Sequence, residues 1–191
     1  MAEWRHVPGF NHRLHRMTMA LEGVAPMAAL QATWQAFGTS ESVCFGDRTV
    51  LDQTCVLEVD ANHLVLSQTV KMPAGISNRL FCTMMLKNEA KTLIMTSHLE
   101  LNSENLRRAV KSGRNVVGQL RHYALHFEPS ADGGCKVTSL GCFNPKGMLL
   151  PRMMNFDRAS VAVAKGMKGI FRSIRALAMQ QQQHDYLNYE P

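Results

Sequence analysis

Residues Asn144–Met179 read NPKGMLLPRMMNFDRASVAVAKGMKGIFRSIRALAM, a turn rich in proline and glycine followed by a long stretch with no further proline. From Phe156 onward, apolar or small residues recur at spacings of three and four, which places them on one face of a helix. These residues are Ala159, Val163, Met167, Ile170, Ile174 and Leu177. The pattern predicts one amphipathic helix over Phe156–Met179, about 36 Å long at 1.5 Å per residue, which is enough to cross a whole sheet.

The other face of this helix is basic, and it carries nearly all of the formal net charge of +6. Between Pro151 and Met179 there are six basic residues and one acidic residue, Asp157. A basic surface suits nucleic acid or an anionic membrane. The chain lacks basic residues interleaved with exposed aromatic residues, the pattern typical of RNA binding, so we expect no nucleic-acid partner.

The 191 residues are enough for one domain with a substantial core. Five cysteines, an odd number without CxxC spacing, favour reduced thiols and a cytoplasmic protein. No apolar run reaches the ~18 residues needed to span a bilayer, so we expect a soluble or peripheral protein. We also expect a monomer.

The rest of the chain alternates between strand patterns and turn signals after one short helix. We expect an N-terminal arm or short edge strand over 1–11 and a folded domain over 12–179. We expect the polar residues 180–191 to form a frayed helix end and a disordered tail. Pro26–Phe37 has helical spacing and is followed by Gly38. Strands are predicted at 12–22, 54–59, 63–72, 79–87, 91–101, 114–128 and 135–143. Short turns such as Asp60-Ala61-Asn62 predict antiparallel pairing of consecutive strands.

This order of elements predicts an α+β fold, in which the long helix lays its apolar face on the concave side of a curved antiparallel sheet. Thirteen methionines accompany only eight phenylalanines. Methionine is flexible and fills irregular apolar space, so its abundance suits an adaptable interior as well as an ordinary core.

Three local signatures stand at the borders of the predicted elements. Asn78-Arg79-Leu80-Phe81 enters a strand after a proline-containing loop, and 118–129 is a long strand that ends in Glu128-Pro129. Asn144–Pro151 is followed by Met154-Asn155 at the start of the long helix. From about Val70 to Leu177 the combination resembles the START domain, which has Asp-Pro-Lys-Gly, Pro and Val-Asn at this last position. START domains are lipid-binding members of the helix-grip superfamily.

The resemblance implies a curved antiparallel sheet wrapped around the C-terminal helix, enclosing a tunnel for one hydrophobic lipid. It implies binding and transfer of that lipid without catalysis or cofactor. Leu80 and Met85 stand where the family has an acidic residue or, in some sterol-binding members, an arginine, which predicts a less polar interior. The expected ligand-binding residues are Met85, Met95, Ser97, Tyr123, Phe156, Val163, Met167 and Ile170.

The resemblance also implies a gate, made by the long helix and the loops beside it, that meets membranes transiently. The loop 102–113 is basic, like the helix. Each basic residue close to an anionic leaflet contributes ~1 kcal/mol to attraction. The expected membrane-contact residues are Arg107, Arg108, Lys111, Lys165, Lys168 and Arg172.

Two other functions stay open at this point. A helix-grip enzyme of cyclase type would need clustered polar groups in the cavity, for which Arg79, His98 and Tyr123 are candidates. An interaction module without ligand would have an incomplete tunnel. A metal site is not expected, because His122 and His126 are ~13 Å apart if their segment is a strand.

Overall fold

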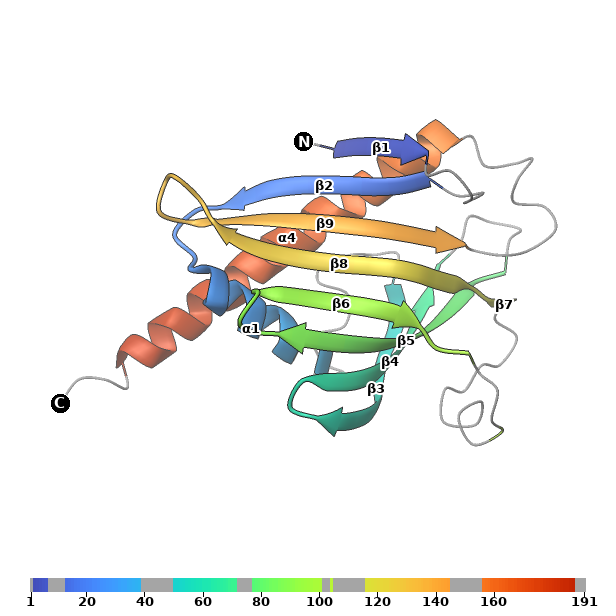
Figure 1. Ribbon diagram of the computed structural model, residues 1–191, viewed down its shortest axis with the longest axis horizontal. Helices are drawn as coiled ribbons and strands as arrows, with labels where there is room; N and C mark the ends of the chain where they lie inside the picture. Colours follow the sequence, from blue (N-terminus) through green and yellow to red (C-terminus); the bar gives the residue numbers. More distant parts are fainter. Residues whose placement is uncertain are drawn as a thin grey trace.

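The computed structural model describes residues 2–6, 13–38, 50–71, 77–100, 104, 116–144 and 156–187. These residues form an α+β fold of one sheet and two helices (Figure 1). The elements are β1 (Ala2–His6), β2 (Arg13–Leu21), α1 (Pro26–Gly38), β3 (Val50–Asp60), β4 (His63–Val70), β5 (Arg79–Asn88), β6 (Leu93–His98), β7 (Val116–Val117), β8 (Gln119–Pro129), β9 (Cys135–Asn144) and α4 (Phe156–Leu187).

The sheet has nine strands, eight of which follow the order β1-β2-β9-β8-β6-β5-β4-β3. Neighbours along this path pair antiparallel, as the turn signals predicted. The short β7 was not predicted as a separate strand, and it pairs parallel with β5. The β8–β9 turn closes with a hydrogen bond from Ser130 N to Gly134 O at 2.9 Å. Gly133 has φ +78° in this turn, a conformation that costs glycine little.

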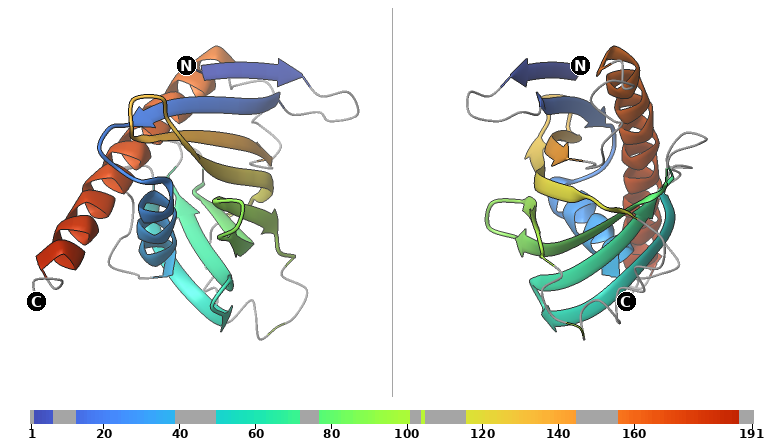
Figure 2. Two further views of the ribbon diagram at one scale, coloured as in Figure 1. Left: turned by 60° about the vertical axis from the view of Figure 1, so that its left-hand side comes forward. Right: turned by 90° about the vertical axis from the view of Figure 1, so that its right-hand side faces the viewer.

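Both helices lie on the concave side of the sheet, and α4 crosses the strands diagonally (Figures 1 and 2). Side chains alternate along each strand, so every second residue faces the helices. One apolar cluster joins this concave face to α1 and to the second half of α4. Fully buried members of the cluster include Leu21, Leu30, Ile94, Leu125, Phe127 and Val137.

The second half of α4 contributes Phe171, Ile174 and Ala178 to this cluster, each with 0% exposure. Their spacing of three and four residues places them on one helix face. Next to them, Arg175 Nε donates a hydrogen bond to the carbonyl oxygen of Glu22 at 3.2 Å. The end of the helix is therefore fixed both to the sheet and to the turn that precedes α1.

The structure decides between the alternatives left for the N-terminal residues. Residues 2–6 form an edge strand, β1, which pairs with β2. Helix α4 begins at Phe156 as predicted but ends at Leu187 rather than Met179. The expected helix end thus extends over 180–187, and 188–191 lie outside the described residues. The glutamine run has no helix breaker and a good helix propensity, so it prolongs the helix.

A smaller apolar cluster lies on the outer face of the sheet, the face turned away from the helices. It consists of Val65, Leu80 and Cys82, with Val56, Leu99 and Val117 packed against it. A hydrogen bond from Leu99 N to Cys82 O at 3.0 Å holds this part together. No helix in the described part of the chain is both long enough and apolar enough to cross a membrane.

Replacing Phe171 by alanine should lower the free energy of unfolding by about 3–5 kcal/mol, because it leaves a cavity between α4 and the sheet. The matched control is Arg172→Ala, since Arg172 is exposed one residue further along the same helix. Urea unfolding followed by circular dichroism measures both variants. Equal losses of unfolding free energy in the two variants would contradict this packing of α4.

Candidate functional site

The candidate site is the part of the concave face that lies beyond the apolar cluster. One row of cross-strand neighbours marks the border between the two. From β2 to β4 the row consists of His15, Gly141, Tyr123, Thr96, Met85 and Leu64. The β4–β5 part of the row is apolar, whereas its other end carries an imidazole and two hydroxyl groups.

Tyr123 and Ser139 place two hydroxyl groups on this face. Tyr123 packs against the apolar cluster, and burial raises the pKa of its phenol to about 12, with the Ser139 hydroxyl acting weakly in the opposite direction. Ser139 is fully buried, and its Oγ meets no partner in ordinary hydrogen-bond geometry within the described residues.

His15 lies directly over Gly141 of the neighbouring strand. A Cβ on Gly141 would stand 2.3 Å from His15 Cε1, so the ring occupies the space that a side chain would need. His15 is only 4% exposed, and burial lowers the pKa of its imidazole to about 4. The imidazole is therefore neutral at pH 7.

Toward the start of β5 the concave face carries two buried polar residues on either side of the buried Phe81. Thr83 is 2% exposed and Arg79 only 3%. The Arg79 guanidinium donates a hydrogen bond to the Ser77 carbonyl, and burial lowers its pKa. The expectation of a less polar interior rested on Leu80 and Met85, and of these Met85 is buried in the apolar cluster. Leu80 belongs to the outer cluster and does not reach the interior.

Three predicted ligand-binding residues lie on the helix side of the sheet or at its interface with α4. Met85 is buried in the apolar cluster, and Tyr123 and Ile170 pack against it. Their role in ligand binding stays a prediction. Phe156, Val163 and Met167 belong to α4, but their side chains lie outside the described residues.

Met95 and Ser97 were assigned to the wrong face of β6. Met95 is 39% exposed and Ser97 is exposed as well. Ile94 and Thr96 are the buried members of this strand, so they, and not Met95 and Ser97, lie on the concave face. The error is a shift of one residue, which reverses every side chain of a strand. Thr96 also donates a hydrogen bond to the Tyr123 carbonyl at 3.3 Å.

The structure describes two of the predicted membrane-contact side chains. Lys168 and Arg172 are exposed one helical turn apart on α4. Lys165 lies on the same helix, but its side chain is outside the described residues, as are Arg107, Arg108 and Lys111 altogether. Membrane contact by these residues stays a prediction.

No group of three or more histidine, cysteine, aspartate or glutamate side chains within the described residues is arranged to hold a metal ion. Cys82 and Cys135 are free thiols in apolar surroundings, and burial raises the pKa of both. Thiols with a raised pKa are poor nucleophiles at neutral pH.

Sequence reasoning missed His15, Thr96 and Ser139 as parts of the concave face. The alternation of β2 contained one usable signal, because His15 shares the parity of Met17, Met19 and Leu21. Ser139 had no such signal, since its position opposite Met17 depends on the pairing of β2 with β9.

Comparison with solved structures shows the same arrangement of sheet and helices in other proteins. Human STARD10 aligns with a TM-score of 0.70 at 16% identity, covering 96% of this chain and 72% of the other. A STAR-related lipid transfer protein from Xanthomonas axonopodis aligns with a TM-score of 0.64 at 16% identity, covering 93% and 92%. The fold is START-like.

An enzyme also aligns with this START-like fold. The Zhui aromatase/cyclase from Streptomyces sp. R1128 aligns with a TM-score of 0.61 at 11% identity, covering 90% of this chain and 96% of the other. No protein-family model and no curated protein sequence matches the chain. At these identities the comparisons establish the START-like fold, and function has to be argued from the site.

The buried His15 should make the stability of the protein depend on pH. Its pKa falls from 6.5 in the unfolded chain to about 4 in the folded one. Between these values only the unfolded chain takes up the proton, so stability is lost as the pH falls from 6.5 toward 4. The loss attributable to this group is about 3 kcal/mol.

Chemical unfolding at pH 7 and pH 4 measures this effect, with His15→Leu as the reference that cannot titrate. The unfolding free energy should drop by about 3 kcal/mol more in the wild type than in the variant. Identical pH dependence in the two proteins would contradict the burial of His15.

Proposed function

We propose that the protein binds a single hydrophobic lipid between the concave face of the sheet and α4, and transfers it between membranes without catalysis. The observation that supports this most directly is the combination of apolar and polar side chains on the concave face. On the described part of this face, Tyr123 borders the apolar cluster, Ser139 lies between the cluster members Leu125 and Met17, and the Arg79 guanidinium lies further along β5. Such a combination suits an amphiphile, with its apolar part toward Met85 and Ile170.

Burial of the apolar part would supply most of the binding free energy, at about 25 cal/mol per Å² removed from water. Polar groups would add orientation, because a polar ligand atom left unpaired in the interior costs about 1–3 kcal/mol. Tyr123 is suited to this role, since its phenol stays protonated and can donate a hydrogen bond at any physiological pH. The START-like fold is shared with proteins named for lipid transfer.

The titration behaviour of the site favours binding over proton transfer. An efficient general acid or base has a pKa close to the working pH. Burial moves the pKa values of the two groups away from 7 in opposite directions. The pKa of His15 falls to about 4, and the pKa of Tyr123 rises to about 12. Neither group is poised to exchange a proton at pH 7.

A cyclase-type enzyme acting on an apolar substrate is the second candidate. The specific observation in its favour is the gathering of His15, Thr96, Tyr123 and Ser139 on one face, together with the shared fold of an aromatase/cyclase. Here Tyr123 would position a carbonyl or hydroxyl group of the substrate. Turnover of a polyketide-like probe by the purified protein would distinguish this function from lipid binding.

Extraction of the purified protein followed by mass spectrometry tests the proposal, and loading with a panel of sterols, fatty acids and phospholipids follows. One lipid per chain is expected. Tyr123→Phe removes only the hydroxyl group and should weaken loading about tenfold, the effect of one buried hydrogen bond. Thr18→Val is the control, because Thr18 faces Thr138 on the outer face. A protein that neither retains nor loads lipid would point to an interaction module instead.

We propose further that α4 presents its basic face to anionic membranes through Lys168 and Arg172, with Lys165 and the loop residues Arg107, Arg108 and Lys111 contributing. The double variant Lys168→Glu and Arg172→Glu should reduce binding to phosphatidylserine liposomes at low salt by at least about tenfold. Lys91→Glu is the control, since Lys91 is exposed in the β5–β6 turn. Unchanged co-sedimentation of the double variant would contradict membrane contact by this face.

A further inference from the structure

A ladder of directly paired residues crosses the outer face of the sheet from β2 to β3. Its four middle members, one on each of β9, β8, β6 and β5, are apolar: Leu140, Ala124, Met95 and Leu86. The ladder begins with Arg16, which pairs with Leu140. It ends with His63, the partner of Leu86, and with Asp60, the partner of His63.

Two of the four apolar members of this ladder are exposed, and the other two, Ala124 and Leu86, are half-buried. Met95 is 39% and Leu140 37% exposed, and Met84 on the neighbouring ladder is 37% exposed. No described helix or strand lies over this ladder (Figure 1), whereas the outer cluster of Val65, Leu80 and Cys82 beside it is buried. Single exposed apolar residues are common on protein surfaces, but a contiguous row of them marks an interaction site.

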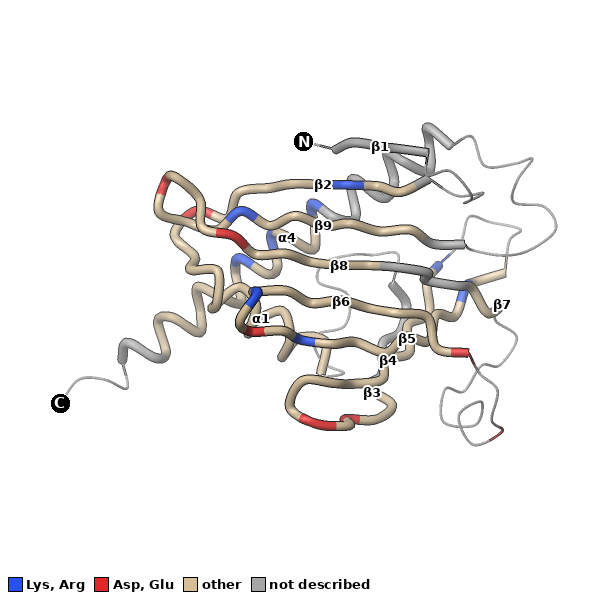
Figure 3. Tube along the Cα trace, viewed as in Figure 1, with Lys and Arg blue, Asp and Glu red and all other residues tan. Residues whose placement is uncertain are grey.

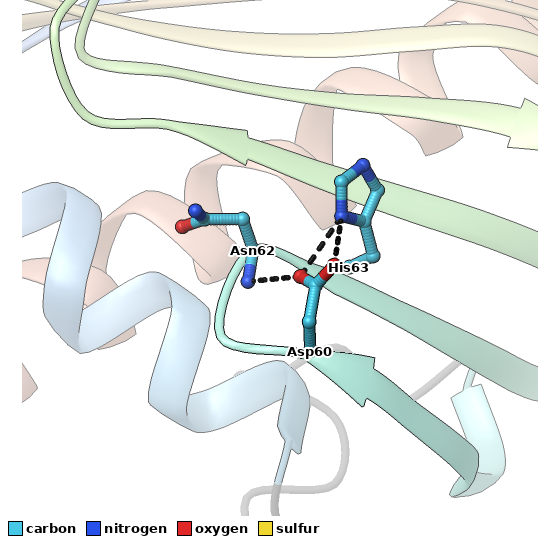
Figure 4. Close-up of polar contacts among 3 residues, drawn as sticks. All are labelled: Asp60, Asn62 and His63. Carbon is cyan, nitrogen blue, oxygen red and sulfur yellow. Dashed lines mark hydrogen bonds and ion pairs between the residues drawn. The ribbon is translucent and has the colours of Figure 1, made fainter.

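The two ends of the ladder carry opposite charge. Figure 3 shows a positive position on β2, a negative group at the turn between β3 and β4, and uncharged positions along the middle of β6. Arg16 is exposed at the positive end. At the other end the Asp60 carboxylate contacts His63 Nδ1 at 2.9 Å and accepts a hydrogen bond from Asn62 N at 2.7 Å (Figure 4).

These contacts fix the charge at the hairpin. The hydrogen bond from Asn62 N, followed by the contact with His63, lowers the pKa of Asp60, so its carboxylate is held ionised and in place. The face therefore has a positive end, an apolar middle and a negative end. A surface with this arrangement is complementary to a second copy of itself rotated by half a turn, because the positive end of each copy then meets the negative end of the other.

We propose that this outer face is the interface of a symmetric homodimer, formed around a two-fold axis that runs parallel to the strands between β8 and β6. This axis places Met95 of each copy against Ala124 of the other, and Leu86 against Leu140. It brings Arg16 of each copy toward the Asp60–His63 pair of the other. A two-fold axis running across the strands would instead place the two Arg16 side chains together.

The dimensions of the face set the expected strength of the dimer. From β2 to β4 there are five steps of about 4.8 Å, or about 24 Å, and eight residues of a strand cover about 26 Å. The buried surface is then about 600 Å² per copy and about 1,200 Å² in total, at the lower limit for a specific interface. A reversible dimer that dissociates at about 10–100 µM fits this size. Both helices and the concave face remain free in it.

Sedimentation velocity of the full chain, from about 5 to 500 µM, tests the proposal across this range. The wild type should shift from monomer to dimer. Met95→Lys should weaken self-association by at least about tenfold, because it buries a charge at the centre of the interface. Met179→Lys is the matched control, since Met179 is 38% exposed on α4, away from this face. Circular dichroism checks that both variants fold.

Charge reversal tests the orientation of the two copies. Arg16→Glu or Asp60→Lys alone places like charges together at both ends, and each should weaken the dimer about three- to tenfold. An equimolar mixture of the two variants contains only opposite pairs, so association should return to near the wild-type level. A wild type that stays monomeric at about 500 µM overturns the dimer, as does equal weakening by Met179→Lys. A mixture that associates no better than its components overturns the proposed axis.

Discussion

The structure depends on the contact between the second half of α4 and the concave face of the sheet. A single curved sheet has an apolar face that must be covered, and here two helices cover it. Phe171, Ile174 and Ala178 supply the contact from α4, while α1 fills the space beside it. Within the described residues, the apolar cluster lies toward the β8–β9 turn, where the hydrogen bond from Arg175 to Glu22 also holds the helix. The polar residues Arg79 and Thr83 lie on the same face toward the start of β5, beside the buried Phe81.

This division of the concave face explains why its polar residues are tolerated. Buried polar groups cost free energy unless they are paired or solvated. Thr96 is satisfied by a strand carbonyl, Arg79 by the Ser77 carbonyl, and His15 stays neutral because burial lowers its pKa. Ser139 has no partner in hydrogen-bond geometry among the described residues. Within the described residues, the face combines close apolar packing with a few buried polar groups, which is the composition expected of a binding surface.

The order and type of the main elements could be predicted from the sequence, because alternation and helical spacing are local properties. The start of α4 at Phe156 was also correct. The face of β6 could not be predicted: Leu93 to His98 is short, with three apolar residues followed by two hydroxyl residues, so each parity contains both kinds of side chain and both look plausible. Burial in the folded protein selects Ile94 and Thr96. The row from His15 to Tyr123 was beyond prediction as well, since it forms only when β2 pairs with β9 and β9 with β8.

The pairing of β2 with β9 also has a consequence for biosynthesis. Thr18 and Thr138 are neighbours in the sheet although 120 positions separate them in the chain. A ribosome therefore releases β2 long before its partner exists, and the apolar side of the strand, with Met17 and Leu21, has nothing to pack against during that interval. Contacts between distant parts of a chain slow folding, and they prolong the time during which aggregation-prone intermediates are exposed. We expect the nascent chain to need protection by a chaperone until β9 and α4 have left the exit tunnel.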